Sequence, residues 1–183
     1  MDIAQKNLVV DERKRKMLKK VYITNGMARS GKDTLASYMN DFIPTLKFSS
    51  IDRVKEVALQ CGWNGEKDEK GRSFLSDLKD LLTEYYDFPF ESIKEKYNEF
   101  LNDDKYSVLL VDIREPAEIE KAVKEFKAKS ILVENNRVEV ITSNSGDAGV
   151  FNYSYDYIIK NNGTLAELKA TVKQFVEEVV LNG

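Results

Sequence analysis

Histidine is absent from this 183-residue chain, and cysteine occurs once, as Cys61. Without histidine, Ser-His-Asp and Cys-His catalysis, a histidine base and a zinc site with imidazole ligands are excluded. A single cysteine excludes an intramolecular disulfide and a CxxC centre. Because Cys61 continues the apolar spacing of Val54, Val57 and Ala58, we expect it to be buried in the core. Chemistry must therefore rest on Lys, Arg, Asp, Glu, backbone amides or a hard metal ion.

The chain also lacks long apolar runs and a strong charge of either sign. No run approaches the roughly 18–20 apolar residues of a membrane-spanning helix, and the charged opening residues contain no apolar signal-peptide core. With 28 Lys+Arg against 31 Asp+Glu, the net charge is −3, which gives no general electrostatic case for binding nucleic acid or anionic lipid. We expect a cytoplasmic globular protein, a monomer or homodimer, that binds neither nucleic acid nor membrane.

What the sequence does contain is an alternation of strand and helix patterns after a charged arm at residues 1–19. Strand patterns occupy residues 21–24, 45–50, 107–112, 130–135 and 155–160, and helical patterns occupy residues 35–42, 54–61, 74–85, 93–101, 119–126 and 165–179. Strands that alternate with helices indicate right-handed βαβ units and a doubly wound parallel sheet. We expect one domain over residues 20–183, with a helical acceptor-side region at 51–104 and a lid loop at 135–153.

Two helix starts carry local signals, and four aromatic residues have two possible roles. Thr164 and Glu167 form a T-x-x-E capping box, and Pro116 is typical of a first helical position. The aromatic residues of the helical region could line a base pocket, but their helical spacing favours packing in the core. These aromatic residues are Tyr85, Tyr86, Tyr97 and Phe100.

The sharpest motif is a G-x-x-x-x-G-K sequence between the first strand and the first helix. Backbone amides of such a loop can wrap a polyphosphate, the helix N-terminus adds positive potential, and the lysine reaches the outer phosphates. The candidate donor-binding residues are Gly26, Met27, Ala28, Arg29, Ser30, Gly31, Lys32, Asp33 and Thr34. The alternative is a glycine turn beside a surface lysine.

Two carboxylates are candidate magnesium ligands. Asp33 stands where a phosphate loop usually has the Ser or Thr whose hydroxyl binds Mg²⁺. A carboxylate can bind Mg²⁺ directly or through water. Asp112 ends the apolar strand SVLLVD, the position from which a carboxylate holds Mg²⁺ in such folds, although it could instead cap the following helix.

Three segments together resemble a known family. They are GMARSGKDT in the loop, DIR at residues 112–114 and YDYIIKNNGTLAEL at residues 155–168. The chain from about Lys20 resembles the adenylate-kinase-like P-loop kinases, especially the deoxynucleoside monophosphate kinases of phage and bacteria. The resemblance implies a P-loop NTPase α/β/α fold with five parallel strands in the order 2-3-1-4-5. It also implies that ATP is the phosphoryl donor, with Mg²⁺, and that a small phosphorylated molecule is the acceptor.

The same resemblance assigns roles to the remaining site residues. Ser49, Arg53 and Arg114 correspond to positions that hold the acceptor phosphate, and Arg114 also acts in catalysis together with Lys32, Asp112 and Arg137. Arg137 corresponds to a lid arginine that closes on the transferring group, and Asn162 and Gly163 lie beside the donor base. Arg72, with Lys67 and Lys79, could extend the acceptor pocket. For each arginine, the alternative is an ordinary ion pair with a nearby carboxylate at the surface.

The sequence leaves three classes of function open. The first is a nucleoside or deoxynucleoside monophosphate kinase. The second is a kinase for another phosphorylated metabolite, such as dephospho-coenzyme A or phosphomevalonate, because the same arginines would suit any small phosphorylated acceptor. The third is a nucleotide-binding regulator without kinase activity, which the unusual Asp33 and the few arginines of the lid would fit.

Overall fold

A computed structural model describes residues 18–138 and 149–182. Most of the predicted N-terminal arm and the middle of the predicted lid loop therefore lie outside the described residues. Among the described helices, none is both long and apolar enough to cross a membrane.

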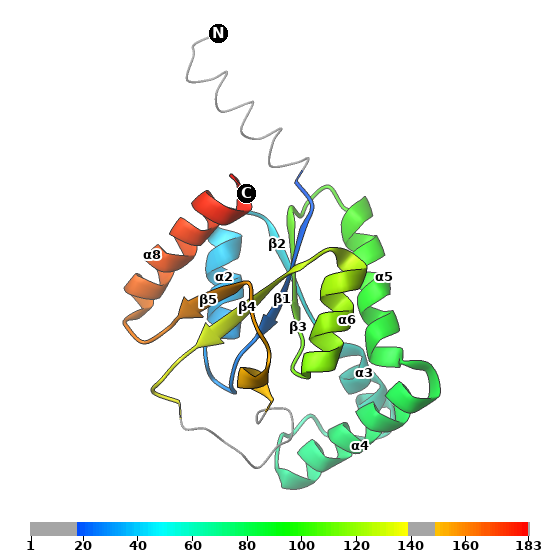
Figure 1. The fold of residues 1–183 in the computed structure, drawn as a ribbon. Coiled ribbons are helices and arrows are strands. Elements are labelled where there is room, and N and C mark those ends of the chain that lie inside the picture. The colour runs from blue at the N-terminus through cyan, green and yellow to red at the C-terminus, as the bar shows by residue number, and fades with distance from the viewer. Residues whose placement is uncertain (1–17, 139–148, 183) are drawn as a thin grey trace, which may run out of the picture.

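Five parallel strands form one sheet in the order β2-β3-β1-β4-β5 (Figure 1). The strands are β1 (Lys20–Asn25), β2 (Thr45–Ser49), β3 (Val108–Asp112), β4 (Lys129–Glu134) and β5 (Tyr157–Lys160). Each coincides with a predicted strand, and the predicted order is confirmed. The interior strand β3 is buried from Val108 to Val111, as its uninterrupted apolar sequence predicts.

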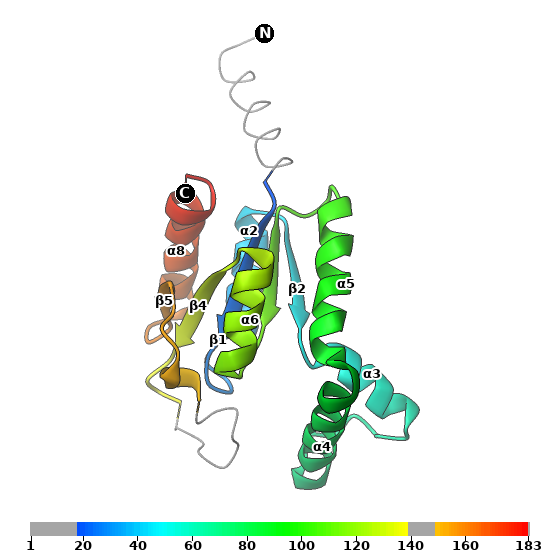
Figure 2. The ribbon, with the colours of Figure 1, turned by 45° about the vertical axis from the view of Figure 1, so that its right-hand side comes forward.

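Helices cover both faces of the sheet (Figures 1 and 2). Helices α2 and α8 pack against one face, where their apolar side chains meet Tyr22 and Leu110, and α5 and α6 pack against the other, where Val21 and Leu109 point. The helix bounds are α2 (Lys32–Phe42), α3 (Asp52–Gln60), α4 (Glu69–Tyr86), α5 (Phe88–Asn102), α6 (Pro116–Phe126) and α8 (Leu165–Phe175), followed by the π-helical turn η2 (Val176–Val180). A short 3-10 helix, η1 (Val150–Asn152), precedes β5.

The alternation of side chains along the strands decides which polar groups meet. Residues two apart in a strand point to the same face. Thr24 therefore shares the α2 face with Tyr22, and Asp112 shares it with Leu110. Lys47 pairs in register with Leu110, so it points to this face as well. The sheet thus presents Thr24, Lys47 and Asp112 near the N-terminus of α2.

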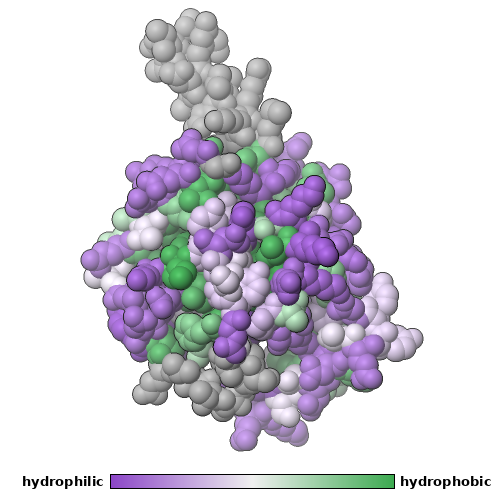
Figure 3. Space-filling model, viewed as in Figure 1, coloured by the Kyte–Doolittle hydropathy of each residue, from purple (hydrophilic) through white to green (hydrophobic). Residues whose placement is uncertain are grey.

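Helices α3, α4 and α5 connect β2 to β3, as the predicted helical region does, and α3 and α4 lie beyond the carboxyl ends of the strands (Figure 2). Both predicted helix starts are confirmed. Pro116 is the first residue of α6, and at α8 the Thr164 hydroxyl accepts from the Glu167 N–H while the Glu167 carboxylate accepts from the Thr164 N–H. On the face shown in Figure 3, hydrophilic residues cover most of the surface.

Two burial predictions are wrong. Cys61 is exposed because α3 ends at Gln60 and the chain turns away at Gly62, so the apolar spacing that buries Val54 and Ala58 stops one turn earlier. Tyr85 and Tyr86, the last two residues of α4, are 88% and 62% exposed. The prediction holds for the other two aromatic residues: Tyr97 packs against the core, and Phe100 is fully buried.

Lys19 ties the start of β1 to the end of α5. Its ammonium donates to the carbonyls of Phe100, Asp103 and Tyr106 at 2.8, 2.6 and 2.8 Å. Two of these carbonyls belong to the C-terminal end of α5, where the helix dipole favours a cation.

We expect Lys19→Met to destabilise the protein. We expect a loss of about 1.5–3 kcal/mol in sum for these charge-assisted hydrogen bonds, because the freed carbonyls can still reach water, so Tm should fall by roughly 3–12 °C. Thermal unfolding followed by circular dichroism measures this. Lys169→Met, which removes an exposed pair with Asp41, is the matched control and should leave Tm nearly unchanged. Equal Tm values for the two variants would show that Lys19 does not hold α5.

Candidate functional site: the loop after β1 and the carboxyl edge of the sheet

The loop between β1 and α2 has a backbone that only glycine fits at two positions. Gly26 and Gly31 have φ angles of +152° and +106°. A Cβ at Gly26 would lie 2.5 Å from the Val133 carbonyl oxygen, and a Cβ at Gly31 would lie 2.4 Å from Asn161 Nδ2. The motif glycines are therefore required by close approaches of the neighbouring strand ends, and the loop is held against the sheet.

Lys32 lies over this loop. Its ammonium donates to the carbonyl oxygens of Gly26 at 2.6 Å and Met27 at 3.1 Å. The side chain begins in the first turn of α2, where the unpaired N–H groups and the helix dipole favour an anion. The loop, the helix start and the ammonium together form a cationic cradle suited to phosphate.

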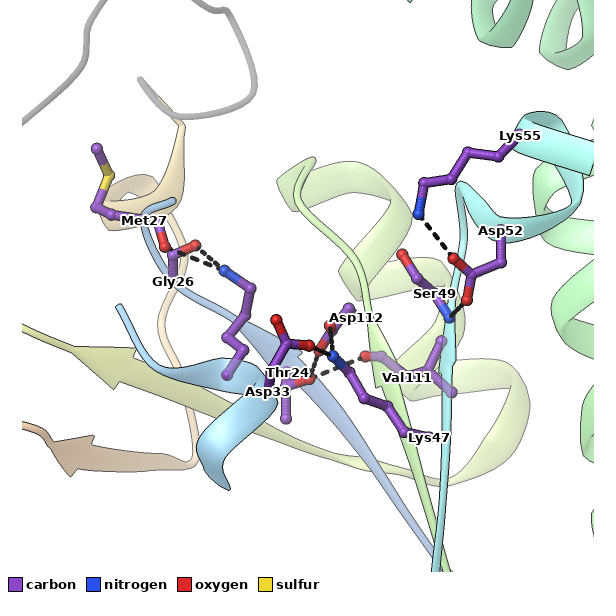
Figure 4. Close-up of polar contacts among 11 residues, drawn as sticks. Thr24, Gly26, Met27, Asp33, Lys47, Ser49, Asp52, Lys55, Val111 and Asp112 are labelled. Atoms are coloured by element: carbon purple, nitrogen blue, oxygen red, sulfur yellow. Dashed lines mark hydrogen bonds and ion pairs between the residues drawn. The ribbon is translucent and has the colours of Figure 1, made fainter. Parts of the chain in front are cut away.

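Asp33 and Asp112 share one cation, the ammonium of Lys47 (Figure 4). Lys47 Nζ contacts Asp33 Oδ1 and lies 3.0 Å from Asp112 Oδ2. Asp33 is exposed, whereas Asp112 is nearly buried and its other oxygen accepts from the Thr24 hydroxyl. Asp112, at the end of β3, is thus held by Thr24 from β1 and Lys47 from β2. Asp33 is linked to Asp112 through the shared ammonium of Lys47.

The charges of this cluster stabilise one another. The hydrogen bond from Lys47 holds the pKa of Asp33 below its usual value; partial burial opposes this shift, and the charges of Lys47, Lys32 and Lys67 add to it. Burial alone would lower the pKa of Lys47, but Asp112 and Asp33 outweigh it and raise that pKa. Both partners therefore remain charged at neutral pH.

The donor set suits Mg²⁺. Carboxylate oxygens at the end of a phosphate loop are hard ligands, and Mg²⁺ is usually bound by one or two of them together with substrate phosphates and water. The ammonium of Lys47 already stands in for a cation between Asp33 and Asp112. Among the described residues, there is no group of three or more acidic, His or Cys side chains that could hold a metal ion.

A second group of side chains joins the phosphate loop to the end of β5. Asn161 is buried and donates from Nδ2 to the Ser30 carbonyl at 2.8 Å. Arg137 donates to the Asn161 carbonyl at 3.1 Å, and Asn162 accepts from the Asn136 N–H at 2.8 Å. The structure thus places the predicted lid arginine beside the predicted donor-base residues Asn162 and Gly163.

Asn25, the last residue of β1, connects three parts of this edge. Its Oδ1 accepts from the Gly26 N–H at 2.8 Å, and its Nδ2 donates to the Arg114 carbonyl at 3.0 Å and to the Tyr155 hydroxyl at 2.8 Å. Asn25 is only 1% exposed. One amide therefore fixes the start of the phosphate loop relative to the backbone of Arg114, an exposed residue two positions after β3.

The end of β2 carries a different cation from the one predicted. Ser49 donates its N–H to Asp52, and Lys55 donates to the other Asp52 oxygen at 2.8 Å, so Lys55 lies beside Ser49 (Figure 4). Arg53 instead pairs with Glu56 at 2.8 Å and lines a groove between α3 and α5. The structure does not bring Arg53 together with the other predicted residues, because the first turn of α3 turns its side chain toward α5.

The three cations predicted to extend the acceptor pocket differ in their surroundings. Arg72 donates to the Lys67 carbonyl at 2.8 Å and so braces the loop before α4, and the charge of Lys67 itself acts on Asp33. Lys79 is 13% exposed and lies 3.0 Å from Glu115 and 2.9 Å from Glu118. Lys79 therefore fastens α4 to the start of α6 and is already neutralised.

Comparisons with known proteins bear on the fold. No protein-family model matches the sequence, and no curated protein matches it significantly. Among solved structures, the chain is similar to TT1252 from Thermus thermophilus, with 17% identity, a TM-score of 0.50 and coverage of 88% of this chain and 98% of that one. It is also similar to shikimate kinase from Aquifex aeolicus, with 16% identity, a TM-score of 0.50 and coverage of 89% and 99%.

The chain has the fold of the P-loop kinases. An all-parallel sheet in the order β2-β3-β1-β4-β5, with helices on both faces, matches the fold of the similar kinase structure along nearly its whole length. At these low identities the likeness concerns the fold alone, so the function must be argued from the site.

Proposed function

We propose that this protein transfers the γ-phosphoryl group of ATP, with Mg²⁺, to a small phosphorylated acceptor, most specifically a nucleoside or deoxynucleoside monophosphate. The observation that carries the proposal is the glycine loop with Lys32 at the carboxyl edge of the sheet, next to the nearly buried carboxylate Asp112. Phosphoryl transfer needs charge neutralisation and alignment more than covalent help. The cations at this edge match that need.

On the donor side, the residues from Gly26 to Thr34 bind the polyphosphate. Lys32 exchanges the two loop carbonyls for outer phosphate oxygens, which are stronger acceptors because they are charged. Asn162 and Gly163 border the donor base, and Asn161 keeps their segment fixed to the phosphate loop.

Asp33 and Asp112 are the residues that would hold Mg²⁺. When bound, the ion neutralises charge on the donor phosphates and helps to align them. The Thr24 hydroxyl keeps the Asp112 carboxylate in place. This carboxylate therefore does not have to become ordered when nucleotide binds.

On the acceptor side, Ser49, Arg114 and Lys55 offer donors to a phosphate at neighbouring strand ends. Lys55 is added to this group in place of Arg53, which lies against Glu56. Arg72 braces the loop that carries Lys67, so it supports the pocket from behind. Arg137 leaves the Asn161 carbonyl to reach the transferring group, and its position links donor binding to closure of the site.

The proposal is tested by a screen for acceptor-stimulated release of ADP from Mg·ATP. The acceptors are the common ribo- and deoxyribonucleoside monophosphates, dephospho-coenzyme A, phosphomevalonate and, because one structural neighbour is a shikimate kinase, shikimate. We expect stimulation by one or a few nucleoside monophosphates. Stimulation by another compound alone would assign the protein to a different kinase class, and no stimulation by any compound would favour a regulator.

A further inference from the structure

Lys47 has no role in the sequence motif, yet it lies at the centre of the proposed metal site. It projects from the edge strand β2 and is about 30% exposed, so most of its side chain is covered by the protein. Its ammonium contacts Asp33 Oδ1 and lies 3.0 Å from Asp112 Oδ2 (Figure 4). These are the same carboxylates that would hold Mg²⁺.

The arrangement follows from the sheet rather than from a chance surface pairing. Strand alternation places Lys47 on the face of α2, and the register sets Ser49 opposite Asp112 and Asp112 opposite Thr24. Thr24 fixes one oxygen of Asp112, which leaves Oδ2 directed to Lys47. The ammonium is therefore held by a carboxylate that cannot turn away without losing its own hydrogen bond.

We propose that Lys47 is a positioning residue that occupies the metal site of the free protein, keeps Asp33 and Asp112 together, and withholds them from a divalent cation until nucleotide phosphates arrive. This inference rests on the proposed function, in which a nucleotide and Mg²⁺ bind at this edge. It assigns to Lys47 a role in the order of binding: the metal enters with the nucleotide and not before it.

The charges explain why the displacement needs nucleotide. In the free protein, a divalent cation must break the contacts of Lys47 with both carboxylates, and it gains few ligands in return. With a polyphosphate in the loop, phosphate oxygens complete the coordination of the metal, and the displaced ammonium lies in a region that has become more negative. Loss of the ammonium should therefore strengthen metal binding to the free protein, without a comparable change when nucleotide is present.

The test measures binding of Mn²⁺, a spectroscopic substitute for Mg²⁺, to the nucleotide-free protein by electron paramagnetic resonance. We expect Lys47→Met to bind Mn²⁺ at least about tenfold more tightly than the wild type, because an ammonium within contact distance of two carboxylates has been removed. Adding Asp112→Asn to Lys47→Met should abolish the gain. Lys169→Met, which makes the same change in net charge beside Asp41 of α2, should bind Mn²⁺ like the wild type.

Equal Mn²⁺ affinities for wild type and Lys47→Met would overturn the inference. So would a gain that survives Asp112→Asn, or an equal gain in Lys169→Met, because the metal would then bind elsewhere or respond only to net charge. If Lys47→Met does not fold, Lys47→Gln removes the same charge while keeping a polar side chain of similar length. Nucleotide binding is measured separately on each protein, so failure of the proposed function is distinguished from failure of this inference.

Discussion

Replacing Lys32 with alanine should lower ATP turnover by about a hundred- to a thousandfold and weaken ATP binding. The loop amides remain in Lys32→Ala, but the ammonium that reaches across the loop is lost; in the free protein it is held by the Gly26 and Met27 carbonyls. A preorganised donor aimed at charge that develops during reaction typically contributes this much to kcat. Calorimetry with a non-hydrolysable ATP analogue, together with the ADP-release assay, measures both effects.

The control for Lys32→Ala is Lys169→Ala. Lys169 lies on α8 and pairs with Asp41, which is at the end of α2 far from the loop. This control should change neither affinity nor turnover. If Lys32→Ala also leaves both unchanged, the glycine loop is a structural turn and the enzyme proposal fails.

Arg114→Ala should reduce kcat/KM for the acceptor by roughly ten- to a hundredfold, the expected loss for a charge-assisted contact worth about 1.5–3 kcal/mol. Most of the loss should appear in the KM of the acceptor, with some loss of kcat from misalignment, while ATP affinity stays nearly constant. The backbone of Arg114 is fixed by Asn25, so the substitution should not displace the loop. Steady-state kinetics with varied acceptor and varied ATP separate these effects.

Trp63 offers an independent measurement of acceptor binding. It is the single tryptophan of the chain, it lies in the loop before α4, and its indole N–H donates to the Glu66 carbonyl at 2.9 Å. Acceptor titrations followed by its fluorescence should give a weaker affinity for Arg114→Ala than for wild type. If Arg114→Ala instead weakens ATP binding and spares the acceptor, Arg114 belongs to the donor side and the assignment of the two subsites is reversed.

The sequence predicted the sheet and most of the helices because both depend on local patterns. The apolar run of β3, the proline that begins α6 and the capping box of α8 each act over a few residues, and all are present in the structure. The two motif glycines could likewise be identified from the sequence. The residues that leave no room for a Cβ at these positions, Val133 and Asn161, are far away in the sequence. The loop was predictable, but the reason for its shape was not.

The burial errors at Cys61 and Tyr85 have the same origin. Helical spacing shows which face of a helix is apolar, but it does not show where the packing partner ends. Cys61 follows the last turn of α3, and Tyr85 lies in the last turn of α4, where its side chain is 88% exposed.

The site residues that sequence reasoning missed are those whose roles depend on contacts between strands. In the sequence, Lys47 is indistinguishable from an ordinary surface lysine of a strand. Its position beside Asp33 and Asp112 follows from the sheet register, which the sequence does not show. Alternation within TLKFS, where Leu46 and Phe48 face the core on the other side, was the available signal. Asn161 and Asn25 gave no signal of their own, because an asparagine after a strand usually marks a turn.

The most direct test of kinase activity is product analysis of a reaction that contains the protein, Mg·ATP and the acceptor found in the screen. Phosphorus NMR and mass spectrometry identify the products. The account predicts that each ADP formed is accompanied by one acceptor molecule that has gained a phosphoryl group, and that Lys32→Ala forms neither. ADP accompanied by inorganic phosphate, with the acceptor unchanged, would contradict it.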